Sequence, residues 1–441
     1  MIAVIMAGGK GTRIAPIAGS VPKPMVKLNG KPVLEYQIDC LRNYGIDEVI
    51  ITVSYKKEAI IEYFGDGSAI SPITGKPFGL KIGYYEESRP LGNAGALFKI
   101  RDRLKEDFLL INADTIFDID FSRFFGFHKS KHALVTLLTH PNSHPYDSAL
   151  IVSDENYRVK EWFSKEDDLP CYYKNRVNAG IHIINPTLIY ETEKRLMEEQ
   201  IDLPLKIDLD RDVLKPAIGK GGVFCYDTSE YVRDMGTPER YESVCSDIRL
   251  DIVSERNLRR KQRAVFFDRD GTINKYVGFV RKTEEFELLP GVTEAIKQIN
   301  KSGYLAIVVT NQPVIARGEI TEAELSEIHN KMETLIGEEG AYIDRIYYCP
   351  HHPDSGFKGE KKELKIECSC RKPKPGMIYK AMIDYNIDLS KSWMIGDEER
   401  DVLAGKSAGC QTILIGETDY GQDYSAPSIK SAVELLMNLE L

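Results

Sequence analysis

The chain has 441 residues, and at roughly 100 to 200 residues per domain this length predicts two or three domains. Hydrophobic residues make up 42% and charged residues 28%, a balance that excludes a disordered or fibrous protein. The net charge of -9 argues against a polyanion-binding surface, so no nucleic-acid partner is expected. No apolar run approaches the roughly 20 residues that cross a bilayer, and residues 1–7 are too short for a signal peptide. The protein is therefore expected to be cytoplasmic, without a membrane partner.

Two series of alternating strand and helix patterns follow one another along the chain, and each predicts an α/β unit with a parallel sheet. In the first series, strands are expected at residues 2–6, 48–53, 81–85, 108–112, 133–138 and 180–184, with a helix from about Pro32 to Tyr44. In the second, strands are expected at 264–267, 304–309, 343–348, 393–395 and 412–415. Residues 247–262 lose strand character and gain basic residues, which predicts a helix leading into a linker. The predicted domains are 1–246 and 263–441.

A glycine loop, Ala-Gly-Gly-Lys-Gly-Thr-Arg at residues 7–13, follows the first predicted strand. Glycines directly after a strand let backbone N–H groups approach an anion, and Lys10, Arg13 and Lys23 add matching charge. These features favour a nucleoside triphosphate as the ligand. The spacing fits neither G-x-x-x-x-G-K-[ST] nor G-x-G-x-x-G, and a bare Gly-Gly-x-Gly is usually only a turn between strand and helix.

The whole run from this loop to Pro-Lys-Pro-Met at residues 22–25 resembles the signature of the sugar-1-phosphate nucleotidyltransferases. Four further matches follow in order, at residues 90–97, 112–115, 178–180 and 234–238. The resemblance implies a Rossmann-like, GT-A-like domain in which a sugar 1-phosphate attacks the α-phosphorus of a nucleoside triphosphate. It assigns Mg²⁺ to Asp114 and Asp234, the leaving pyrophosphate to Arg13 and the attacking phosphate to Lys23. It assigns nucleotide and sugar contacts to Gly8, Gly9, Gly11, Leu91, Gly92, Asn178 and Gly180.

Two residues depart from that family pattern. Asn93 stands where Thr or Ser is more frequent, and Ala113 replaces the usual Gly before Asp114. Neither change removes a charged group, so catalysis is expected, while the choice of base stays open. Within the family, the opening segment is most similar to guanylyltransferases acting on D-glycero-α-D-manno-heptose 1-phosphate.

The second series opens with a strand that ends in Asp268-Arg-Asp270-Gly-Thr. Two carboxylates at i and i+2 beyond a strand both face the crevice where parallel sheets bind ligands, so one can attack phosphorus while the other moves a proton. This motif, with three later ones, resembles the haloacid dehalogenase-like phosphatases. The later motifs are Thr310-Asn311, Arg371-Lys372 and Gly396-Asp397 with Asp401.

The resemblance implies a role for each of these residues. Asp268 forms an aspartyl phosphate, Asp270 acts as acid and base, and Thr310 and Lys372 stabilise the transferred phosphoryl group. Asp268, Asp270 and Asp397 are expected to hold Mg²⁺, with Asn311 and Arg371 contacting the substrate. Lys374 competes for the role of Lys372 on sequence alone. Pro313, Val314 and Glu398 depart from the usual pattern.

A metal site is expected in the loop between these motifs. Cys349 and His351 form one close ligand pair and Cys368 and Cys370 another, and such a Cys₃His set favours structural Zn²⁺. His352 is the rival to His351. Only 39 residues separate Asp270 from Thr310, which leaves no room for a large cap domain, so the metal loop is expected to wall the pocket. The loop resembles that of heptose 1,7-bisphosphate phosphatases, and histidinol-phosphate phosphatases share its metal pattern.

Both resemblances imply steps of one pathway, and together they predict a bifunctional enzyme of GDP-heptose synthesis. It is expected to remove the 7-phosphate of D-glycero-α-D-manno-heptose 1,7-bisphosphate and then to transfer GMP from GTP to the 1-phosphate. One alternative keeps both chemistries but changes the sugar, as in a mannose 1-phosphate guanylyltransferase fused to a histidinol-phosphate-like phosphatase. Another is a regulatory nucleotide-sugar-binding protein with one inactive domain. A homo-oligomer is left open.

Overall fold

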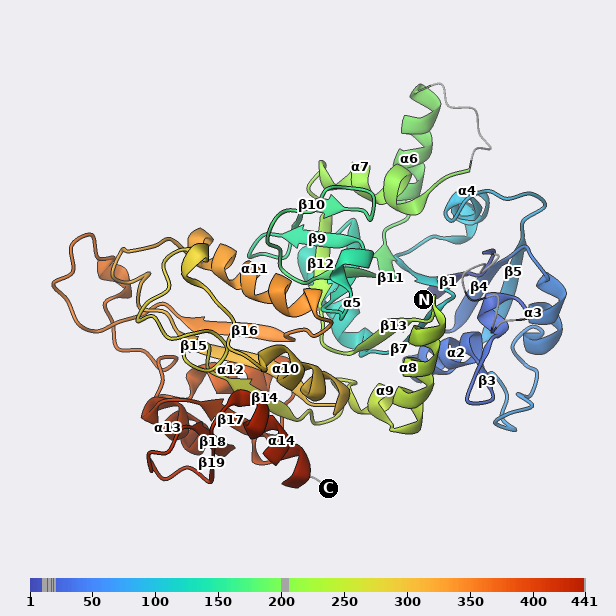
Figure 1. Cartoon of the computed structure of the whole chain (residues 1–441). Coiled ribbons are helices and arrows are strands. Elements are labelled where there is room, and N and C mark those ends of the chain that lie inside the picture. Colours follow the sequence, from blue (N-terminus) through green and yellow to red (C-terminus); the bar gives the residue numbers. More distant parts are fainter. Residues whose placement is uncertain (10–13, 15–16, 18, 20, 200–205, 440–441) are drawn as a thin grey trace. The chain divides into compact units, whose positions relative to one another are not determined.

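The computed structural model describes residues 1–9, 14, 17, 19, 21–199 and 206–439. It divides into two compact units (Figure 1). Unit 1 comprises Met1–His140, Ile151–Trp162 and Asn178–Asn257, and unit 2 comprises Pro141–Leu150, Phe163–Val177 and Leu258–Leu441. Arg13, predicted to be catalytic, and Gly11, predicted to bind nucleotide, lie outside the described residues, as does Lys10.

Unit 1 is built on a nine-stranded sheet in which β1 lies between β4 and β6 and runs parallel to both. The strands are β1 (Ile2–Met6), β4 (Glu48–Val53), β5 (Lys81–Glu86), β6 (Phe108–Asn112), β8 (Val135–His140), β9 (Leu150–Ser153), β10 (Val159–Phe163), β11 (Val177–Ile184) and β12 (Val223–Asp227). Residues 3–5 of β1 and most of β4 are fully buried, because a parallel sheet is covered on both faces and needs apolar residues throughout. β11 runs antiparallel beside β6.

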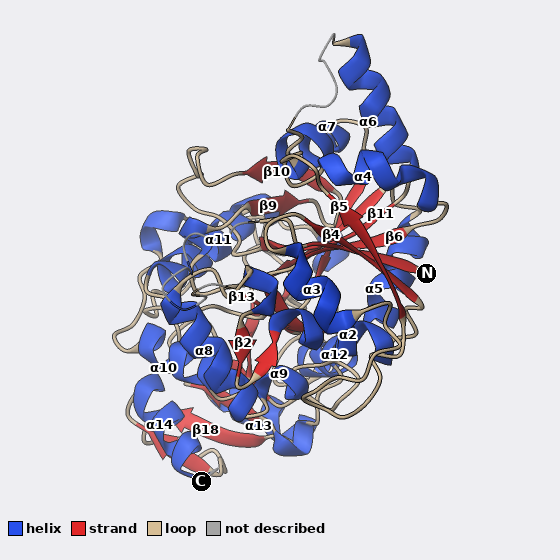
Figure 2. Cartoon of the chain, turned by 90° about the vertical axis from the view of Figure 1, so that its right-hand side faces the viewer, coloured by secondary structure: helices blue, strands red, loops and turns tan. Residues whose placement is uncertain are grey.

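Helices cover this sheet. They are α2 (Val33–Asn43), α3 (Lys57–Phe64), α4 (Gly95–Ile100), α5 (Phe121–Lys131), α6 (Thr187–Glu198), α7 (Lys215–Ile218), α8 (Pro238–Arg249) and α9 (Ile252–Glu255). Figure 2 shows α2 and α3 beside the strands β4 and β5. Ile38 of α2 and Phe64 of α3 are fully buried in the same core as Ile51 of β4. A hairpin of β2 (Lys27–Leu28) and β3 (Lys31–Pro32) and an antiparallel ribbon of β7 (Thr115–Asp118) and β13 (Tyr231–Asp234) complete the unit.

Unit 2 contains a six-stranded parallel sheet in the order β16-β15-β14-β17-β18-β19. Its strands are β14 (Ala264–Phe267), β15 (Leu305–Asn311), β16 (Arg345–Cys349), β17 (Trp393–Gly396), β18 (Gln411–Ile415) and β19 (Tyr424–Ala426). Its helices are α10 (Val292–Lys301), α11 (Glu322–Glu338), α12 (Gly376–Tyr385), α13 (Glu399–Ala408) and α14 (Ile429–Leu439). In chain order the strands read 3-2-1-4-5-6, which is a doubly wound arrangement with a switch point between β14 and β17.

Two segments from the middle of the first predicted domain are grouped with unit 2, namely residues 141–150 and 163–177. We call residues 163–177 the inserted loop. Its Arg176 forms an ion pair with Glu333 of α11 at 3.3 Å, and both side chains are buried. Glu333 also accepts a hydrogen bond from the Asn175 N–H at 2.7 Å, and Thr334 accepts one from the Tyr173 N–H at 2.9 Å. Buried polar partners of this kind hold a loop in one conformation, so the inserted loop is an ordered part of unit 2.

The junction predicted at residues 247–262 is more ordered than a solvated linker. The Arg256 side chain is buried and donates to the Ser229 carbonyl at 3.1 Å. The Asn257 amide donates to Tyr44 Oη and to Asp118 Oδ1, both at 2.7 Å. The end of unit 1 is therefore anchored on its own core. No helix among the described residues is long and apolar enough to cross a membrane.

Candidate active sites

The first candidate site lies at the switch point of the sheet in unit 1. The chain leaves β1 for β4 on one side and later returns to β6 on the other, so the loops after β1 and β6 diverge. Such a divergence opens the crevice in which α/β sheets bind ligands. Gly8 and Gly9 follow β1, and Asp114 follows β6. The glycine loop and the first predicted metal ligand therefore meet at one edge of the sheet.

Asp234 is brought to the same place by the β7–β13 ribbon. It pairs with Thr115, the residue after Asp114, and the Met235 N–H donates to the Asp114 carbonyl at 3.1 Å. Lys23 forms an ion pair with the Asp114 carboxylate, and Arg240 donates to both carboxylate oxygens of Asp234 at 3.0 and 3.1 Å. Two carboxylates flanked by two cations can hold a divalent ion and a phosphate together, since oxygen donors are those that Mg²⁺ prefers.

The predicted sugar loop lies beside Asn112, at the end of β6. Gly180 has φ +70°, and a β-carbon on it would lie 2.2 Å from Asn112 Nδ2, so no larger residue fits. Asn178 Oδ1 accepts from the Gly180 N–H at 3.2 Å and contacts His182 Nε2 at 3.0 Å. These contacts fix the backbone of the loop next to the strand that carries Asp114.

The loop at residues 90–97 is held by the chain around Ile207. Gly92 has φ +81°, and a β-carbon there would lie 2.3 Å from the Ile207 carbonyl oxygen. Asn93 Oδ1 accepts from the Leu209 N–H at 2.7 Å. Asn93 departs from the usual Thr or Ser of the family, and this bond gives it a structural role. Its side-chain amide holds the segment around Ile207, which packs on Gly92.

Glu87 is a candidate site residue that the sequence patterns did not single out. It follows β5, its Oε2 accepts from the Leu91 N–H at 3.3 Å, and a β-carbon on Gly8 would lie 3.3 Å from its Oε1. The carboxylate thus lies between the two predicted nucleotide loops. Burial raises the pKa of Glu87. A carboxylate offers only hydrogen-bond acceptors, so in this place it could bind the donor groups of a base but not a phosphate.

The second candidate site lies at the switch point of unit 2, where Asp268 follows β14 and Asp397 follows β17. The carboxylates of Asp268, Asp397 and Asp401 offer oxygen atoms that all lie within 4.8 Å of one another. Burial and the Asp401 charge raise the pKa of Asp268 to about 7, although Lys372 opposes the rise, and burial with Asp401 and Glu398 raises that of Asp397 to about 6. Three acids crowded in a buried place fit a divalent cation.

Lys372 joins this group as predicted, and Lys374 does not. The buried Lys372 ammonium lies 2.7 Å from both Asp268 and Asp401 carboxylates. Lys374 instead lies 3.4 Å from Glu367 on the surface. The Asn311 side-chain amide forms two hydrogen bonds with the backbone of Lys372. Asn311 Nδ2 donates to the Lys372 carbonyl, and Asn311 Oδ1 accepts from the Lys372 N–H, both at 3.0 Å. Asn311, predicted to contact substrate, therefore positions Lys372.

The Asp270 carboxylate, predicted to bind Mg²⁺, is hydrogen-bonded by three neighbouring side chains. Arg269 donates to its two oxygens at 2.9 and 3.0 Å, and Asn274 and Gln312 add one bond each at 3.1 and 2.9 Å. Burial favours the neutral acid, but the Arg269 charge and the hydrogen bonds from Arg269, Asn274 and Gln312 together outweigh burial and lower the pKa of Asp270. The carboxylate thus faces a guanidinium and two amides, outside the group formed by Asp268, Asp397 and Asp401.

Arg269 is in turn held by His329 of α11, since its Nη1 lies 3.2 Å from His329 Nε2. The Arg269 side chain is fully buried. Burial lowers the pKa of His329 to about 3, and the Arg269 charge adds to the effect, so the imidazole is neutral and accepts the bond. No sequence pattern marks this pair, because His329 lies far from any motif.

The departures at the phosphatase motifs have local explanations. Glu398 is the N-cap residue of α13 and pairs with Arg400, which explains an acid in place of a basic residue. Val314 is fully buried in the core of unit 2. Gly271 has φ +88°, and a β-carbon there would lie 2.1 Å from Asp397 Oδ2, so glycine is required beside the carboxylate group.

Cys349, His351, Cys368 and Cys370 form the second possible metal site. The sulfur atoms lie 3.2–3.5 Å apart, and His351 Nδ1 lies 3.3 Å from Cys370 Sγ. Ligands 2.3 Å from a tetrahedral Zn²⁺ would be about 3.7 Å apart, so the group needs little change to bind one. His352 does not belong to this group, and its Nδ1 accepts from the Asp354 N–H at 3.2 Å. Of the two histidines, His351 is therefore the one positioned to bind a metal.

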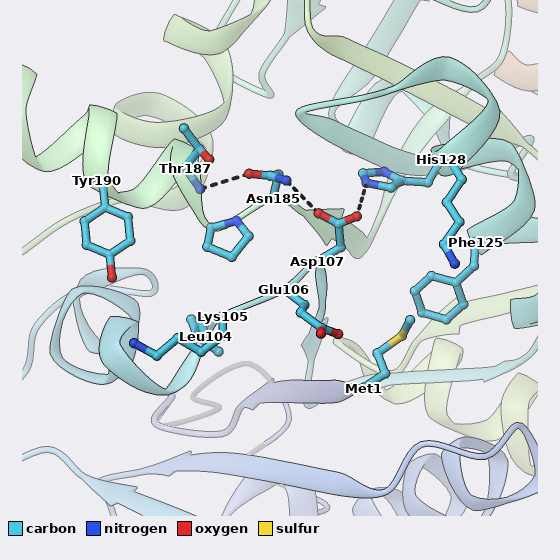
Figure 3. A pocket seen from close by; sticks show the side chains of 12 residues that line it. Met1, Leu104, Lys105, Glu106, Asp107, Phe125, His128, Asn185, Thr187 and Tyr190 are labelled. Carbon is cyan, nitrogen blue, oxygen red and sulfur yellow. Dashed lines mark hydrogen bonds and ion pairs between the residues drawn. The ribbon is translucent and has the colours of Figure 1, made fainter.

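A cavity of about 580 Å³ in unit 1 lies away from the candidate site of that unit, beside Met1 at the opposite end of β1 from Gly8 (Figure 3). Asp107 bridges His128 at 3.3 Å and the Asn185 amide at 2.8 Å. His128 Nδ1 contacts Thr136 Oγ1 at 2.7 Å, so both ring nitrogens have partners. These polar groups tie strands and helices to one another, and none of the predicted site residues lines the cavity.

Comparisons with known proteins agree with this division. Residues 2–249 match the family model described as Nucleotidyl transferase, and residues 369–432 match one described as HAD-hydrolase-like.

Over 178 residues the chain is 40% identical to the D-glycero-beta-D-manno-heptose-1,7-bisphosphate 7-phosphatase of Haemophilus ducreyi, covering 40% of this chain and 93% of that protein. The enzyme of the same name from Escherichia coli K12 is 38% identical over 175 residues, covering 40% and 88%. HddC of Yersinia pseudotuberculosis is structurally similar, with a TM-score of 0.46 and 25% identity over 56% of this chain and 99% of that one.

Proposed function

The chain belongs to the nucleotidyl transferase family and, in its second part, to the family of the heptose bisphosphate phosphatases, and from this premise we propose two successive reactions. The enzyme removes the 7-phosphate of D-glycero-α-D-manno-heptose 1,7-bisphosphate and then transfers GMP from GTP to the remaining 1-phosphate. The observation that carries the proposal is a cluster of paired acidic and basic side chains at the switch point of each sheet, Lys23, Asp114 and Asp234 in one compact unit and Asp268, Lys372 and Asp397 in the other.

In unit 2, Asp268 attacks the 7-phosphorus, and the sugar oxygen leaves as the phosphorus–oxygen bond breaks. Lys372 and Thr310 neutralise and position the transferred phosphoryl group, since Lys372 is already 2.7 Å from the nucleophile. Asp270, whose pKa is lowered in the substrate-free structure, takes up a proton when the negatively charged phosphate binds beside it, and it gives that proton to the leaving oxygen. It then takes a proton from the water that hydrolyses the aspartyl phosphate. Mg²⁺, held by Asp268, Asp397 and Asp401, would supply charge neutralisation here.

In unit 1, the 1-phosphate oxygen attacks the α-phosphorus of GTP, and pyrophosphate leaves. The obstacle is repulsion between two anions, which positioned charges overcome without a covalent intermediate. Lys23 binds the attacking phosphate, and Asp114 with Asp234 holds the Mg²⁺ that would offset charge at the α-phosphate when bound. Arg13 keeps its proposed role at the leaving pyrophosphate.

The proposed base of the nucleotide is guanine, and Glu87 is the residue that we expect to distinguish guanine from adenine. Guanine presents the N1–H and 2-amino donors side by side, and a carboxylate offers acceptors only. Adenine lacks that pair of donors, so it would leave the half-buried carboxylate without partners. Glu87 lies between Gly8 and Leu91, where a base next to the glycine loop would be read.

We assign Zn²⁺ to the Cys₃His group, with a structural role, because all four tetrahedral positions are filled by protein ligands. The group lies in the loop that leads into Arg371 and Lys372, so the metal orders a wall of the phosphatase pocket. A cytoplasmic location is proposed too, since nucleoside triphosphates are found there and all eight cysteines are free thiols.

The anomer is the point at which this chain is proposed to differ from its phosphatase relatives. Those relatives carry the β anomer in their names. The transferase part resembles enzymes for the α-1-phosphate, and a single chain is productive only if its phosphatase delivers the anomer that its transferase uses. The α preference is therefore part of the proposal.

A coupled assay tests the proposal. The purified full chain is given the α-1,7-bisphosphate with each of the four nucleoside triphosphates in turn, and both phosphate and pyrophosphate are measured. Rapid pyrophosphate release with GTP alone is expected, with Glu87→Gln reducing the preference for GTP over ATP by about 10-fold or more. If phosphate is released but none of the four reactions produces pyrophosphate, the proposed transferase activity is refuted.

A further inference from the structure

His182 lies in β11, four residues after Asn178, and its Nε2 is 3.0 Å from Asn178 Oδ1. In an extended strand, four residues span about 13 Å, so side chains at this spacing do not ordinarily meet. Gly180, between the two, has φ +70°, and a glycine in this conformation is typical of a β-bulge, which bends the strand. We attribute the contact between His182 and Asn178 to this bend.

The orientation of the Asn178 amide follows from its two partners. The Gly180 N–H donates to Asn178 Oδ1 at 3.2 Å. A backbone N–H is a donor only, so the atom that it meets must be the amide oxygen and not the amide nitrogen. The same oxygen faces His182 Nε2, so Nε2 must carry the hydrogen and donate. The contacts therefore fix both the amide and the tautomer of the imidazole.

The other ring nitrogen supports this tautomer. His182 is 1% exposed, and its Nδ1 has no hydrogen-bond partner in the described part of the chain. Burial lowers the pKa of His182 to about 3, so the ring is neutral and Nδ1 carries no hydrogen. A buried acceptor without a partner costs free energy, and an apolar ring here would avoid that cost. Stability alone therefore does not explain a histidine at this position.

The Asn178 amide nitrogen is left available for a ligand. Both contacts of the amide are made by Oδ1, and among the described residues Asn178 Nδ2 donates to no other group. Gly180 packs against Asn112, and β11 runs antiparallel to β6. The step from Gly180 back to Asn178 thus leads in the same direction as the step from Asn112 to Asp114. Asn178 lies at the edge of the sheet that carries the candidate transferase site.

We propose that His182 is a positioning residue of the transferase, which holds the Asn178 amide so that its NH₂ group donates to a hydroxyl oxygen of the sugar 1-phosphate. One hydrogen bond to Oδ1 would let the amide swing about that bond, whereas two donors that converge on the oxygen fix the direction of the NH₂ group. His182 acts through Asn178 and contacts no substrate itself. The inference rests on the transferase function proposed above.

The first test compares the two substrates of the transferase in the full-length enzyme. His182→Phe keeps a buried ring and removes the donor. It is expected to raise KM for the sugar 1-phosphate about 10-fold and to leave KM for GTP and kcat within about 2-fold. His182→Gln places an amide nitrogen near the position of Nε2, and it should restore KM to within about 3-fold of wild type. Equal rises of both KM values in His182→Phe would overturn the inference.

His128→Phe is the matched control, since His128 is also a buried histidine of unit 1 but has its contacts beside Met1, away from the site. It should leave the ratio of the two KM values unchanged. A double-mutant cycle then tests whether His182 acts through Asn178. In an Asn178→Ala background, His182→Phe should change KM for the sugar 1-phosphate by less than about 2-fold. A full effect of His182→Phe in that background would overturn the inference.

The tautomer is tested without turnover. Long-range ¹H–¹⁵N spectra of histidine-labelled enzyme at neutral pH should show a neutral ring with hydrogen on Nε2, whose signals are missing in His182→Phe. Hydrogen on Nδ1 instead would overturn the inference. Pyrophosphate release with mannose 1-phosphate but not with heptose 1-phosphate would refute the proposed sugar, and the same KM comparison with mannose 1-phosphate would then decide the role of His182.

Discussion

Asp268 and Asp114 follow strands of two different sheets, and each has its own lysine partner. Because the two carboxylates belong to different compact units, the two activities should separate by mutation. Asp268→Asn is expected to abolish phosphate release, at least 1,000-fold, and to leave GMP transfer to supplied heptose 1-phosphate within a few-fold. Asp114→Ala should do the reverse. Steady-state assays of both activities on each folded variant check this, and one variant that loses both would contradict the two-site account.

The Arg269–His329 pair predicts a subtler effect on the same phosphatase. Replacing His329 with Ala leaves the buried Arg269 Nη1 without its His329 acceptor, so Arg269 should hold the Asp270 carboxylate less firmly. We expect kcat for the sugar bisphosphate to fall about 10- to 100-fold. The sugar alkoxide is a poor leaving group, so its departure slows when Asp270 is not positioned to protonate it. The first step with p-nitrophenyl phosphate needs no acid, so its burst of p-nitrophenol should persist. Loss of that burst would place the defect elsewhere than at Asp270.

At the level of elements, the short apolar strands of the two main sheets were predictable from the sequence, and the small antiparallel ribbon outside them was not. The predicted strands at residues 2–6, 48–53, 108–112 and 264–267 coincide with β1, β4, β6 and β14, since each is a short apolar run buried on both faces. The ribbon of β7 and β13 was missed: it lies outside the main sheet and is only four residues per strand. The same ribbon brings Asp234 next to Asp114. The sequence motifs at these two residues were therefore recognised, while the ribbon that joins them was not predicted.

Contacts between distant parts of the chain explain the other omissions. Arg269 and Glu87 gain their significance from partners that only the folded chain supplies, namely His329 and two glycine-rich loops. No local sequence pattern marks such residues. The clustering of Cys349, His351, Cys368 and Cys370, by contrast, was predictable because each pair is close in sequence. The sequence left His351 and His352 as rivals, and the structure groups only His351 with the cysteines.

The metal loop should behave as one element. Cys368→Ser removes a ligand from the Cys₃His group and is expected to lower bound Zn²⁺ from about one per chain to a small fraction, with a loss of at least 10-fold in phosphatase kcat. GMP transfer should be spared, because the ligands all belong to unit 2. Elemental analysis alongside both assays provides the readout, with Cys171→Ser, an exposed free thiol, as the matched control. Full phosphatase activity in a zinc-free Cys368→Ser enzyme would contradict the structural role.

The inserted loop should contribute to the stability of unit 2. Glu333→Ala removes the buried partner of Arg176 and an acceptor of the Asn175 N–H, and breaking a buried ion pair costs about 3 to 5 kcal/mol. We expect the free energy of unfolding of unit 2 to fall by about that amount. Urea titration followed by the fluorescence of Trp393, in a Trp162→Phe background, reports on this unit. Glu338→Ala, exposed on the same helix, should change it by less than 0.5 kcal/mol, and an equal effect of both variants would refute the role of the pair.

At the scale of the whole molecule, two doubly wound sheets each present a reactive edge, and the proposed reactions share one intermediate. The phosphatase must cut the 7-phosphate and spare the 1-phosphate, because the 1-phosphate is the nucleophile of the transferase. This order explains why two chemistries with different nucleophiles occur in one chain. It also makes the position of cleavage and the anomer the central claims.

Phosphorus-31 NMR of the α-1,7-bisphosphate, incubated with enzyme and Mg²⁺ in the absence of nucleotide, tests those claims most directly. The account predicts that heptose 1-phosphate and inorganic phosphate accumulate in equal amounts, and that the α anomer is consumed faster than the β anomer. Adding GTP should then convert the 1-phosphate signal into the two coupled signals of a GDP-sugar. Accumulation of heptose 7-phosphate, or a strong preference for the β anomer, would contradict it.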